Sequence, residues 1–250
     1  MRRNTYFIAD LHLGAGYIAD QREHERRIAA WLDSIEPDAA RLYILGDALD
    51  YWYEYRYVVP RGYVRFFGAL ARLADAGVEI TWLKGNHDTW IFDYLPQEIG
   101  IKVVDGVLDT EIDSRRFVME HGDGCGEPRR SYRVIHRVFR NRLAQILYSA
   151  IHPRWTVGFA HRWSAHSRKN GHTPAASNFD SVNDPLVKWA NNYAAFHPGV
   201  DYFIFGHRHI EVDTELACGA RMCIIGDGFK LMTYGLWDGH EFSIRKMEQL

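Results

Sequence analysis

The sequence predicts an α/β fold in which a mostly parallel sheet is covered by helices. Between residues 4 and 86, short apolar runs of strand type alternate with amphipathic helical segments. The apolar runs end in Asp, Asn or His rather than in plain turn residues. The chain has 250 residues, of which 47% are hydrophobic, so it can form one large core without disulfide bonds.

The expected elements follow one another along the chain. Three buried strands are predicted at residues 4–10, 41–47 and 78–86. Two amphipathic helices are predicted at residues 21–35 and 62–77, the second closed by a glycine. A β-hairpin should follow from residue 107 onward, and the last 50 residues have the pattern of further strands with short turns. We therefore expect an α/β half, a helical insert and then a mainly β half.

The predicted insert is strongly basic. Residues 129–172 contain ten Lys or Arg and no Asp or Glu, whereas the rest of the chain carries 20 basic and 32 acidic groups, a net charge of −12. Four arginines recur at helical spacing, at Arg130, Arg133, Arg137 and Arg140, beside a second, apolar stripe. A solvated helix usually mixes both signs of charge, so this segment is expected to bind an anionic partner.

Several anionic partners suit this composition. Arginine binds diphosphate through forked hydrogen bonds, and an apolar groove suits acyl chains. Basic amphipathic helices also attach proteins to anionic membrane surfaces. Nucleic acid is the competing partner for a basic and aromatic segment, although the acidic remainder of the chain argues against it.

The cysteine pattern and the N-terminal residues indicate the cellular compartment of the protein. Cys125, Cys218 and Cys223 provide neither a CxxC spacing nor an even disulfide framework, which favours a reducing compartment. The apolar run before Asp10 is too short for the core of a signal peptide. No stretch approaches the ~20 apolar residues of a membrane span. We therefore expect a cytoplasmic protein.

Side chains that bind metals follow the predicted strands. They are Asp10, His12, Asp47, Asp50, Asn86, His87, Asp88, His121, His207 and His209. In open α/β sheets, ligands bind beyond the carboxyl ends of the strands, where these residues should lie. Even seven ligands from this set, comprising two carboxylates, one amide oxygen and four imidazoles, are too many for one ion but suit two ions that share a carboxylate. Mixed oxygen and nitrogen donors favour Mn, Fe or Zn, and such pairs promote phosphoryl transfer.

The order of these motifs resembles that of the calcineurin-like metallophosphoesterases. The matching motifs are Asp10-x-His12, Gly46-Asp47, Gly85-Asn86-His87-Asp88, His121 and Gly206-His207-x-His209, within residues 8–209. The resemblance implies a four-layer α/β/β/α sandwich in place of a single parallel sheet. It implies one domain over residues 1–250, with a helical cap inserted at residues 129–172.

The resemblance also implies roles for the site residues. One divalent ion would be held by Asp10, His12 and His209. The second would be held by Asn86, His121 and His207. Asp47 would bridge the two ions. His87 would be a catalytic residue that stabilises or protonates the leaving oxygen, oriented by Asp50. Mn²⁺ is the expected metal, with Zn²⁺ or Fe as alternatives.

Within this superfamily the sequence is similar to the UDP-2,3-diacylglucosamine diphosphatases of lipid A synthesis. The similarity lies in "FIADLHLG", "YILGDALDYWYEY", "HGDGCG" and the basic insert that follows them. It implies cleavage of a nucleotide-diphosphate lipid to UMP and an acylated sugar phosphate, at the inner leaflet of a membrane. Substrate-binding residues implied in the cap are Tyr132, Arg133, Arg137, Ser167, Arg168 and Lys169.

One motif departs from the lipid A enzymes, and other functions stay open. Many of those enzymes have Gly-Asn-Arg-Asp where this chain has His87, so a branch with His here and a sister enzyme with another substrate are both compatible. A metal-dependent phosphodiesterase, nuclease or phosphatase is an alternative, although "GDALDYW" lacks the Gly-Asp-x-x-Asp-Arg-Gly of protein phosphatases. A non-catalytic binding module is the alternative outside the enzymes.

Overall fold

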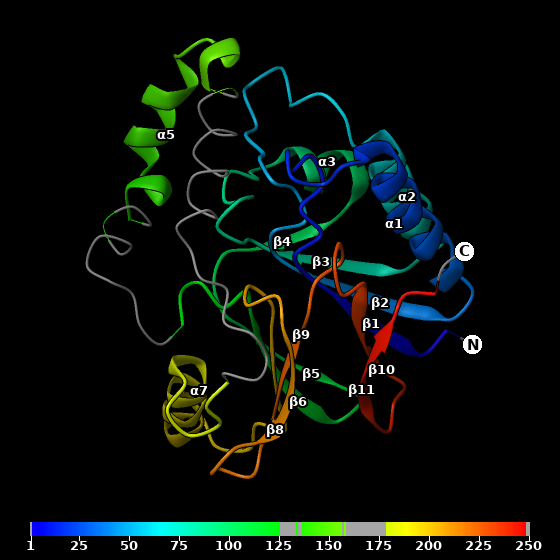
Figure 1. Cartoon of the computed structure of the whole chain (residues 1–250), viewed down its shortest axis with the longest axis vertical. Helices are drawn as coiled ribbons and strands as arrows, with labels where there is room; N and C mark the ends of the chain where they lie inside the picture. Colours follow the sequence, from blue (N-terminus) through cyan, green and yellow to red (C-terminus); the bar gives the residue numbers. More distant parts are fainter. Residues whose placement is uncertain (1, 126–133, 135–136, 157, 159–178, 249–250) are drawn as a thin grey trace.

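A computed structural model describes residues 2–125, 134, 137–156, 158 and 179–248 (Figure 1). Its principal elements in chain order are β1 (Asn4–Ile8), α1 (Gln21–Ile35), β2 (Ala39–Leu45), α2 (Val64–Asp75), β3 (Glu79–Leu83), α3 (Tyr94–Ile99), β4 (Lys102–Val104), β5 (Leu108–Ile112), β6 (Arg115–Glu120), α5 (Arg142–Ser149), α7 (Pro185–Phe196), β7 (Tyr202–Phe205), β8 (Glu211–Glu215), β9 (Arg221–Ile225), β10 (Thr233–Trp237) and β11 (Phe242–Lys246). The predicted strands and helices of the first 86 residues are confirmed: α1 has the predicted bounds, β2 begins and ends two residues earlier, and β1, α2 and β3 are shorter.

The first sheet has six strands in the order β11-β10-β1-β2-β3-β4. Strands β1 to β3 are parallel, as predicted, and β4 adds to them in parallel, whereas β10 and β11 join antiparallel from the end of the chain. Helices α1 and α2 cover one face of this sheet, where Trp31, Leu32, Phe66 and Leu70 pack against β-strand residues such as Trp82. Burial of large apolar side chains on this face is the main stabilising contribution of the layer.

The second sheet has five strands in the order β5-β6-β7-β9-β8. The predicted hairpin forms β5 and β6, and β7 and β9 add to it in parallel. Helix α7 covers the outer face through Leu186, Val187 and Ala190. The prediction of a mainly β second half missed this helix. A start signal was present, because Asp184 caps the helix and accepts a hydrogen bond from the Leu186 amide, with Pro185 at the first position.

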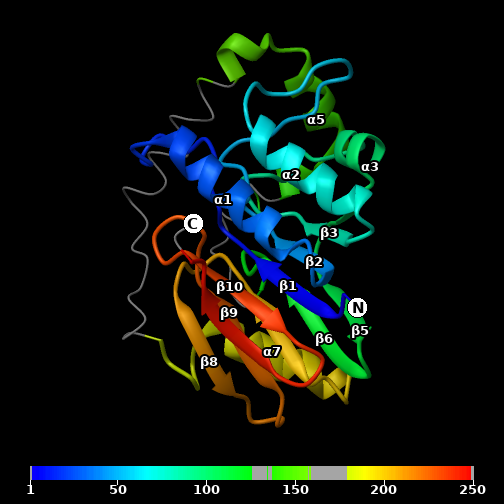
Figure 2. The same cartoon turned by 90° about the vertical axis from the view of Figure 1, so that its right-hand side faces the viewer.

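The two sheets pack face to face and complete a four-layer α/β/β/α sandwich (Figures 1 and 2). Strand β1 contributes side chains both to the core between the first sheet and its helices and to the core between the two sheets. Tyr6 and Ile8 pack toward the helices, while Phe7 and Ala9 join the core between the sheets. A strand buried on both faces has a continuous apolar run instead of an alternating one. The implied sandwich is therefore confirmed, and the simpler expectation of a single parallel sheet described only one half of it.

Part of the basic insert is described, and its helix α5 lies beside the loops that follow β2 and β3 (Figures 1 and 2). Hydroxyls from one aromatic segment reach it, since Tyr53 donates to the Gln145 carbonyl and Tyr51 pairs with the Tyr148 hydroxyl. No residue of α5 is buried. Among the described helices, none combines the length and apolar character that a membrane span requires.

Candidate dimetal site

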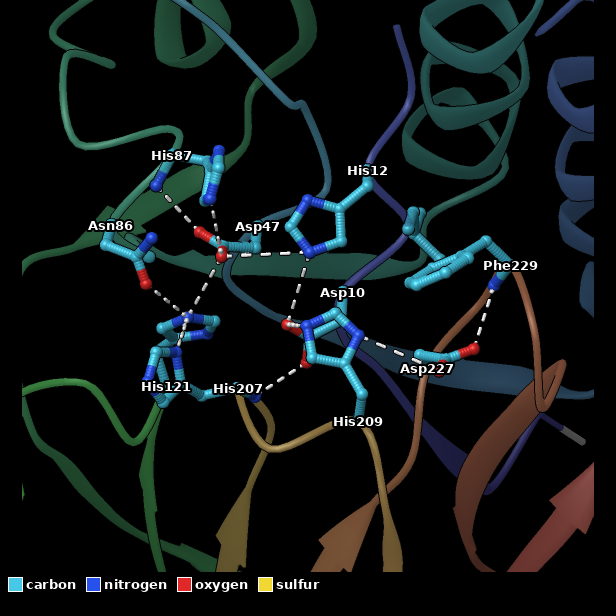
Figure 3. A network of polar contacts seen from close by, with 12 residues as sticks. Asp10, His12, Asp47, Asn86, His87, His121, His207, His209, Asp227 and Phe229 are labelled. Carbon is cyan, nitrogen blue, oxygen red and sulfur yellow. Dashed lines mark hydrogen bonds and ion pairs between the residues drawn. The ribbon is translucent and has the colours of Figure 1, made fainter. Parts of the chain in front are cut away.

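The candidate ligands converge where strands β1, β2, β3, β6 and β7 end (Figure 3). Five of them have a backbone in the left-handed region, namely Asp10 (φ 53°), His12 (φ 45°), Asp47 (φ 52°), His207 (φ 66°) and His209 (φ 51°). This conformation is uncommon for residues other than glycine, although Asp and His tolerate it better than most. The gathering of five left-handed residues at one site indicates local backbone strain that the surrounding core imposes, as is typical of functional sites.

The first cluster joins Asp10, His12 and His209, whose ligand atoms all lie within 4.8 Å of one another. The Asp10 Oδ1 atom is 3.7 Å from His12 Nε2 and 3.5 Å from His209 Nε2. Asp10 is fully buried, and its other oxygen accepts a hydrogen bond from the amide of His207 at 2.6 Å. The end of β1 is thereby joined directly to the loop after β7.

The second cluster joins Asp47, His121 and His207 in the same way. The His121 Nε2 atom lies 3.2 Å from His207 Nδ1 and 3.3 Å from Asn86 Oδ1. The other ring nitrogen of His121 contacts the Leu45 carbonyl at 2.7 Å, which fixes the orientation of the ring. The three residues implied for the second ion therefore lie together, at the ends of β3, β6 and β7.

Asp47 belongs to the second cluster and also approaches His12 of the first (Figure 3). Its Oδ2 atom is 3.9 Å from His12 Nε2 on one side and 3.3 Å from His121 Nε2 on the other. Its Oδ1 atom accepts a hydrogen bond from the His87 amide at 2.8 Å. A carboxylate with this placement can serve ions on both sides, which is the geometry that the bridging role requires.

Close approach of the backbone explains the glycines in these motifs. A Cβ on Gly46 would lie 2.6 Å from His121 Nδ1, and a Cβ on Gly85 would lie 2.2 Å from Asp47 Oδ1. Contacts below about 3 Å do not occur for real Cβ atoms, so any larger residue would force the ligands apart. The Gly-Asp and Gly-Asn pairs thus let neighbouring strand ends bring their polar side chains together.

The charges of the site depend on one another. Burial alone would raise the pKa of Asp47, but the neighbouring His121 and His87 hold that pKa well below its ordinary value. Burial would likewise lower the pKa of His121, yet the Asp47 carboxylate raises it well above the usual range. Burial and the adjacent His121 lower the pKa of His207 to about 4, so His207 is neutral at pH 7. Asp47 and His207 are therefore already in the forms that bind metals, an ionised carboxylate and a neutral imidazole, whereas His121 would release its proton when a metal binds.

The residues fit a pair of divalent ions. The buried Asp10 Oδ1 atom accepts no hydrogen bond from any residue that the structure describes, and it faces two imidazole nitrogens. A buried carboxylate oxygen without a hydrogen bond is costly unless a cation compensates it. Carboxylate, amide and imidazole donors together are typical of Mn, Fe and Zn sites.

His87 lies beside this centre, and Asp50 contacts it as the sequence suggested. The closest contact is with the main chain, because His87 Nδ1 lies 2.9 Å from the Asp50 carbonyl. A carbonyl only accepts, so Nδ1 carries the proton and Nε2 is left facing the site, 4.0 Å from Asp47 Oδ2. The Asp50 carboxylate lies 3.5 Å from His87 and 3.6 Å from His12 Nδ1, so it serves both rings.

Most cap residues proposed from the sequence are not described. Tyr132, Arg133, Ser167, Arg168 and Lys169 lie outside the described residues. Arg137 is described and is exposed.

The aromatic segment "DYWYEYRYVV" mainly performs a packing role. Trp52 enters the helix-side core, and alternate tyrosines contact the cap. Glu54 of the same segment accepts hydrogen bonds from three successive amides at the start of α3, those of Phe92, Asp93 and Tyr94. Cys125 also has a structural role, because burial and the nearby Glu120 raise the pKa of its thiol far above the ordinary value.

Two further carboxylates lie near the centre, and of these only Asp88 was among the candidates from the sequence. Asp88 accepts hydrogen bonds from the Gly85 and Ala48 amides, at 2.7 and 3.0 Å, and so ties the second and third strand ends together. Asp227 follows β9 and lies behind His209. Its signal was present as "CIIGDG", a strand followed by Gly-Asp, the same pattern that identified Asp47.

Comparison with known proteins agrees with this architecture. The family model of the calcineurin-like phosphoesterases matches residues 4–211, and the chain therefore belongs to that family. A UDP-2,3-diacylglucosamine hydrolase of Porphyromonas gingivalis is 44% identical over 261 aligned residues that cover both chains completely. An enzyme of the same name from Serratia proteamaculans is 30% identical, over 86% of this chain and 85% of the relative. A third, from Nitrosococcus oceani, is 29% identical over 82% of this chain and 78% of the relative.

Proposed function

We propose that the protein hydrolyses the pyrophosphate bond of UDP-2,3-diacylglucosamine and releases UMP and 2,3-diacylglucosamine 1-phosphate. The observation that carries the proposal is the pair of ligand clusters that Asp47 connects. They occur in a chain that matches a UDP-2,3-diacylglucosamine hydrolase over its whole length. The clusters support phosphoryl-transfer chemistry, and the name of the relative indicates the substrate.

The proposed ligands divide into two sets around the bridging Asp47. The first ion would be held by Asp10, His12 and His209, and the second by Asn86, His121 and His207. Two bound divalent ions lower the pKa of a water molecule and neutralise negative charge on the phosphoryl oxygens. Mn²⁺ is the proposed metal, because mixed carboxylate and imidazole ligands accept it readily.

His87 is proposed as the residue that assists the leaving phosphate oxygen. Its Nδ1–H donates to the Asp50 carbonyl, which leaves Nε2 directed to the site. When protonated, Nε2 can hydrogen-bond the departing oxygen or transfer its proton to it as charge develops there. The Asp50 and Asp47 carboxylates, 3.5 and 4.0 Å from the ring, favour the protonated form.

The insert at residues 129–172 is proposed as a cap that binds the lipid part of the substrate. Its described part displays apolar side chains to solvent, among them Leu143, Leu147 and Trp155. The basic residues Arg133, Arg137, Arg168 and Lys169 would bind the diphosphate, and the hydroxyls of Tyr132 and Ser167 would add hydrogen bonds to the substrate. The same surface would contact the cytoplasmic face of the inner membrane, because apolar and basic side chains together suit an anionic lipid surface.

Product analysis by phosphorus NMR tests the proposal. Protein loaded with Mn²⁺ is incubated with UDP-2,3-diacylglucosamine and, separately, with UDP-N-acetylglucosamine as the unacylated control. We expect UMP from the acylated substrate alone. Cleavage of a small chromogenic diester with neither nucleotide sugar turned over would instead indicate a phosphodiesterase with another substrate. Absence of bound metal from the active preparation would contradict the dimetal site itself.

A further inference from the structure

The loop that follows β9 is folded by one oxygen of Asp227. The Oδ1 atom accepts hydrogen bonds from the amides of Phe229, Lys230 and Leu231, at 3.2, 2.6 and 2.8 Å. The main-chain oxygen of Asp227 accepts another from the Thr233 amide at 2.9 Å. Asp227 is 1% exposed, so these bonds form inside the protein. The Oδ1 atom alone makes the side-chain hydrogen bonds of this turn. The Oδ2 atom takes no part in them.

The second oxygen faces a candidate metal ligand. Asp227 Oδ2 lies 3.7 Å from His209 Nδ1, just beyond hydrogen-bond distance (Figure 3). Both atoms are buried, and neither makes a hydrogen bond with any residue that the structure describes. An imidazole N–H and a carboxylate oxygen are complementary, and leaving two such atoms buried without a hydrogen bond would be costly. Shortening this separation by a few tenths of an ångström, through a small rotation of the imidazole, would form the hydrogen bond.

The opposite nitrogen of the same ring points to the proposed first ion. His209 Nε2 lies 3.5 Å from Asp10 Oδ1, within the cluster that includes His12. We propose that Asp227 is a positioning residue, which accepts the Nδ1–H of His209 and thereby keeps the Nε2 lone pair directed at the metal. The proposal rests on the dimetal site of the proposed function. Carboxylates behind metal-binding histidines act in this way, by fixing the tautomer and raising the basicity of the ring.

The Asp227 loop is attached to the other ligands of the same ion. The Gly228 amide donates to the Asp10 carbonyl at 3.2 Å. The Phe229 ring meets the His12 and His209 rings nearly at right angles, with centroids 5.7 and 5.3 Å away. Since the backbone amide of Phe229 is held by Asp227 Oδ1, one carboxylate controls both the loop and the imidazole in front of it.

Among the described residues, no equivalent carboxylate lies behind His121, the central histidine of the proposed second ion. His121 Nδ1 contacts the Leu45 carbonyl, a main-chain group that no substitution at Asp227 affects. Loss of the Asp227 carboxylate should therefore weaken the first ion and leave the second unchanged. A selective effect of this kind separates a positioning role from a general loss of stability.

The decisive variant is Asp227→Asn. Asparagine keeps an oxygen that can hold the turn, but its NH₂ group cannot accept a hydrogen bond from Nδ1–H and instead favours the wrong tautomer. Binding of Mn²⁺ is measured by the loss of its free-ion EPR signal during titration. We expect one of the two dissociation constants to rise by about 10- to 100-fold and the other to stay within a factor of two. Asp238→Asn is the matched control, because Asp238 forms a similar turn through the His240 and Glu241 amides, far from the ligands.

Several outcomes are informative. Two unchanged dissociation constants in Asp227→Asn would overturn the proposal, as would equal weakening of both. If that variant does not fold, NMR of ¹⁵N-labelled, Zn²⁺-loaded wild-type protein still decides, since the His209 ring must carry its proton on Nδ1. A proton on Nε2 would overturn the assignment. A wild-type protein that binds two ions without cleaving UDP-2,3-diacylglucosamine would contradict the proposed substrate while leaving the role of Asp227 open to the same titration.

Discussion

The candidate dimetal site and the cap are attached to the molecule in opposite ways. The ligands Asp10, His12, Asp47 and His121 are at most 2% exposed, and hydrogen bonds to the backbone fix several of them. In α5, by contrast, no residue is buried, and Leu147 is 63% exposed. The candidate dimetal site is thus built into the end of the core, whereas the described part of the cap lies on its surface.

This difference matches the demands of the two regions. Phosphoryl transfer requires ligands that are already in place when the substrate arrives, because reorganisation would cost free energy in the transition state. A surface that receives acyl chains requires accessible apolar area instead. Tyr51, Tyr53 and Tyr55 connect the two regions, since their segment follows Asp50 directly and their hydroxyls reach the cap.

The largest effect should come from Asp47→Ala. Removal of this carboxylate takes away a shared ligand from both clusters and leaves the buried His12 and His121 without their common acid partner. We expect kcat/KM to fall by more than about 10³-fold, together with loss of bound metal measured by mass spectrometry. Asp213→Ala, which removes a surface ion pair with Arg221, should leave both unchanged. Retention of two ions in Asp47→Ala would contradict the bridging role.

His87→Ala should separate chemistry from metal binding. General acid assistance is worth about 10²–10⁴-fold, so kcat should fall by that factor while two ions remain bound. The effect should be smaller for a diester whose leaving group is a good one, because a weakly basic oxygen needs no proton. Loss of one ion would instead make His87 a ligand, a concrete alternative because its ring also lies within 4.8 Å of ligand atoms of His12 and Asp47.

Substitutions in the cap should affect only the lipid substrate. Ile146 and Leu147 are 54% and 63% exposed, so the double serine variant removes apolar surface without opening a cavity. We expect kcat/KM for UDP-2,3-diacylglucosamine to fall by about tenfold or more, as loss of a buried apolar side chain implies, with no change for a small diester. Phe196→Ser is the control, since that side chain is 83% exposed on α7. Equal losses on both substrates would mean that α5 only supports the fold.

The convergence of the candidate ligands could be predicted from the sequence because its signal is local. Each ligand follows a buried strand, and residues such as Asp10 and His12 are two positions apart at the end of one. Parallel strands bring their carboxyl ends to one edge, so the order of the motifs was enough to gather seven side chains in space. The left-handed backbone at five of them left no local signal beyond the residue types themselves.

Other features could not be predicted because they depend on distant contacts. The position of β10 beside β1 is set by packing between segments more than 220 residues apart. The role of Asp227 depends on His209 lying in front of it, which "GDG" alone does not reveal. An apolar stripe such as that of the insert can cover the core or bind a ligand, and the pattern does not decide between these two because both require the same spacing.

The smallest effect should come from Tyr53→Phe, which removes one hydrogen bond between the core and the cap. The Tyr53 hydroxyl donates to the Gln145 carbonyl at 2.6 Å, and a single bond of this kind contributes about 0.5–1.5 kcal/mol. We expect proteolytic cleavage of the cap to become about fivefold faster, measured by limited proteolysis followed by mass spectrometry, while the metal content stays the same. Tyr57→Phe is the matched control, because that ring is 84% exposed. If the cleavage rate of Tyr53→Phe equals that of the control, the tyrosine contacts do not hold the cap, and its attachment must come from apolar packing such as that of Trp90 on Phe139 and Tyr148.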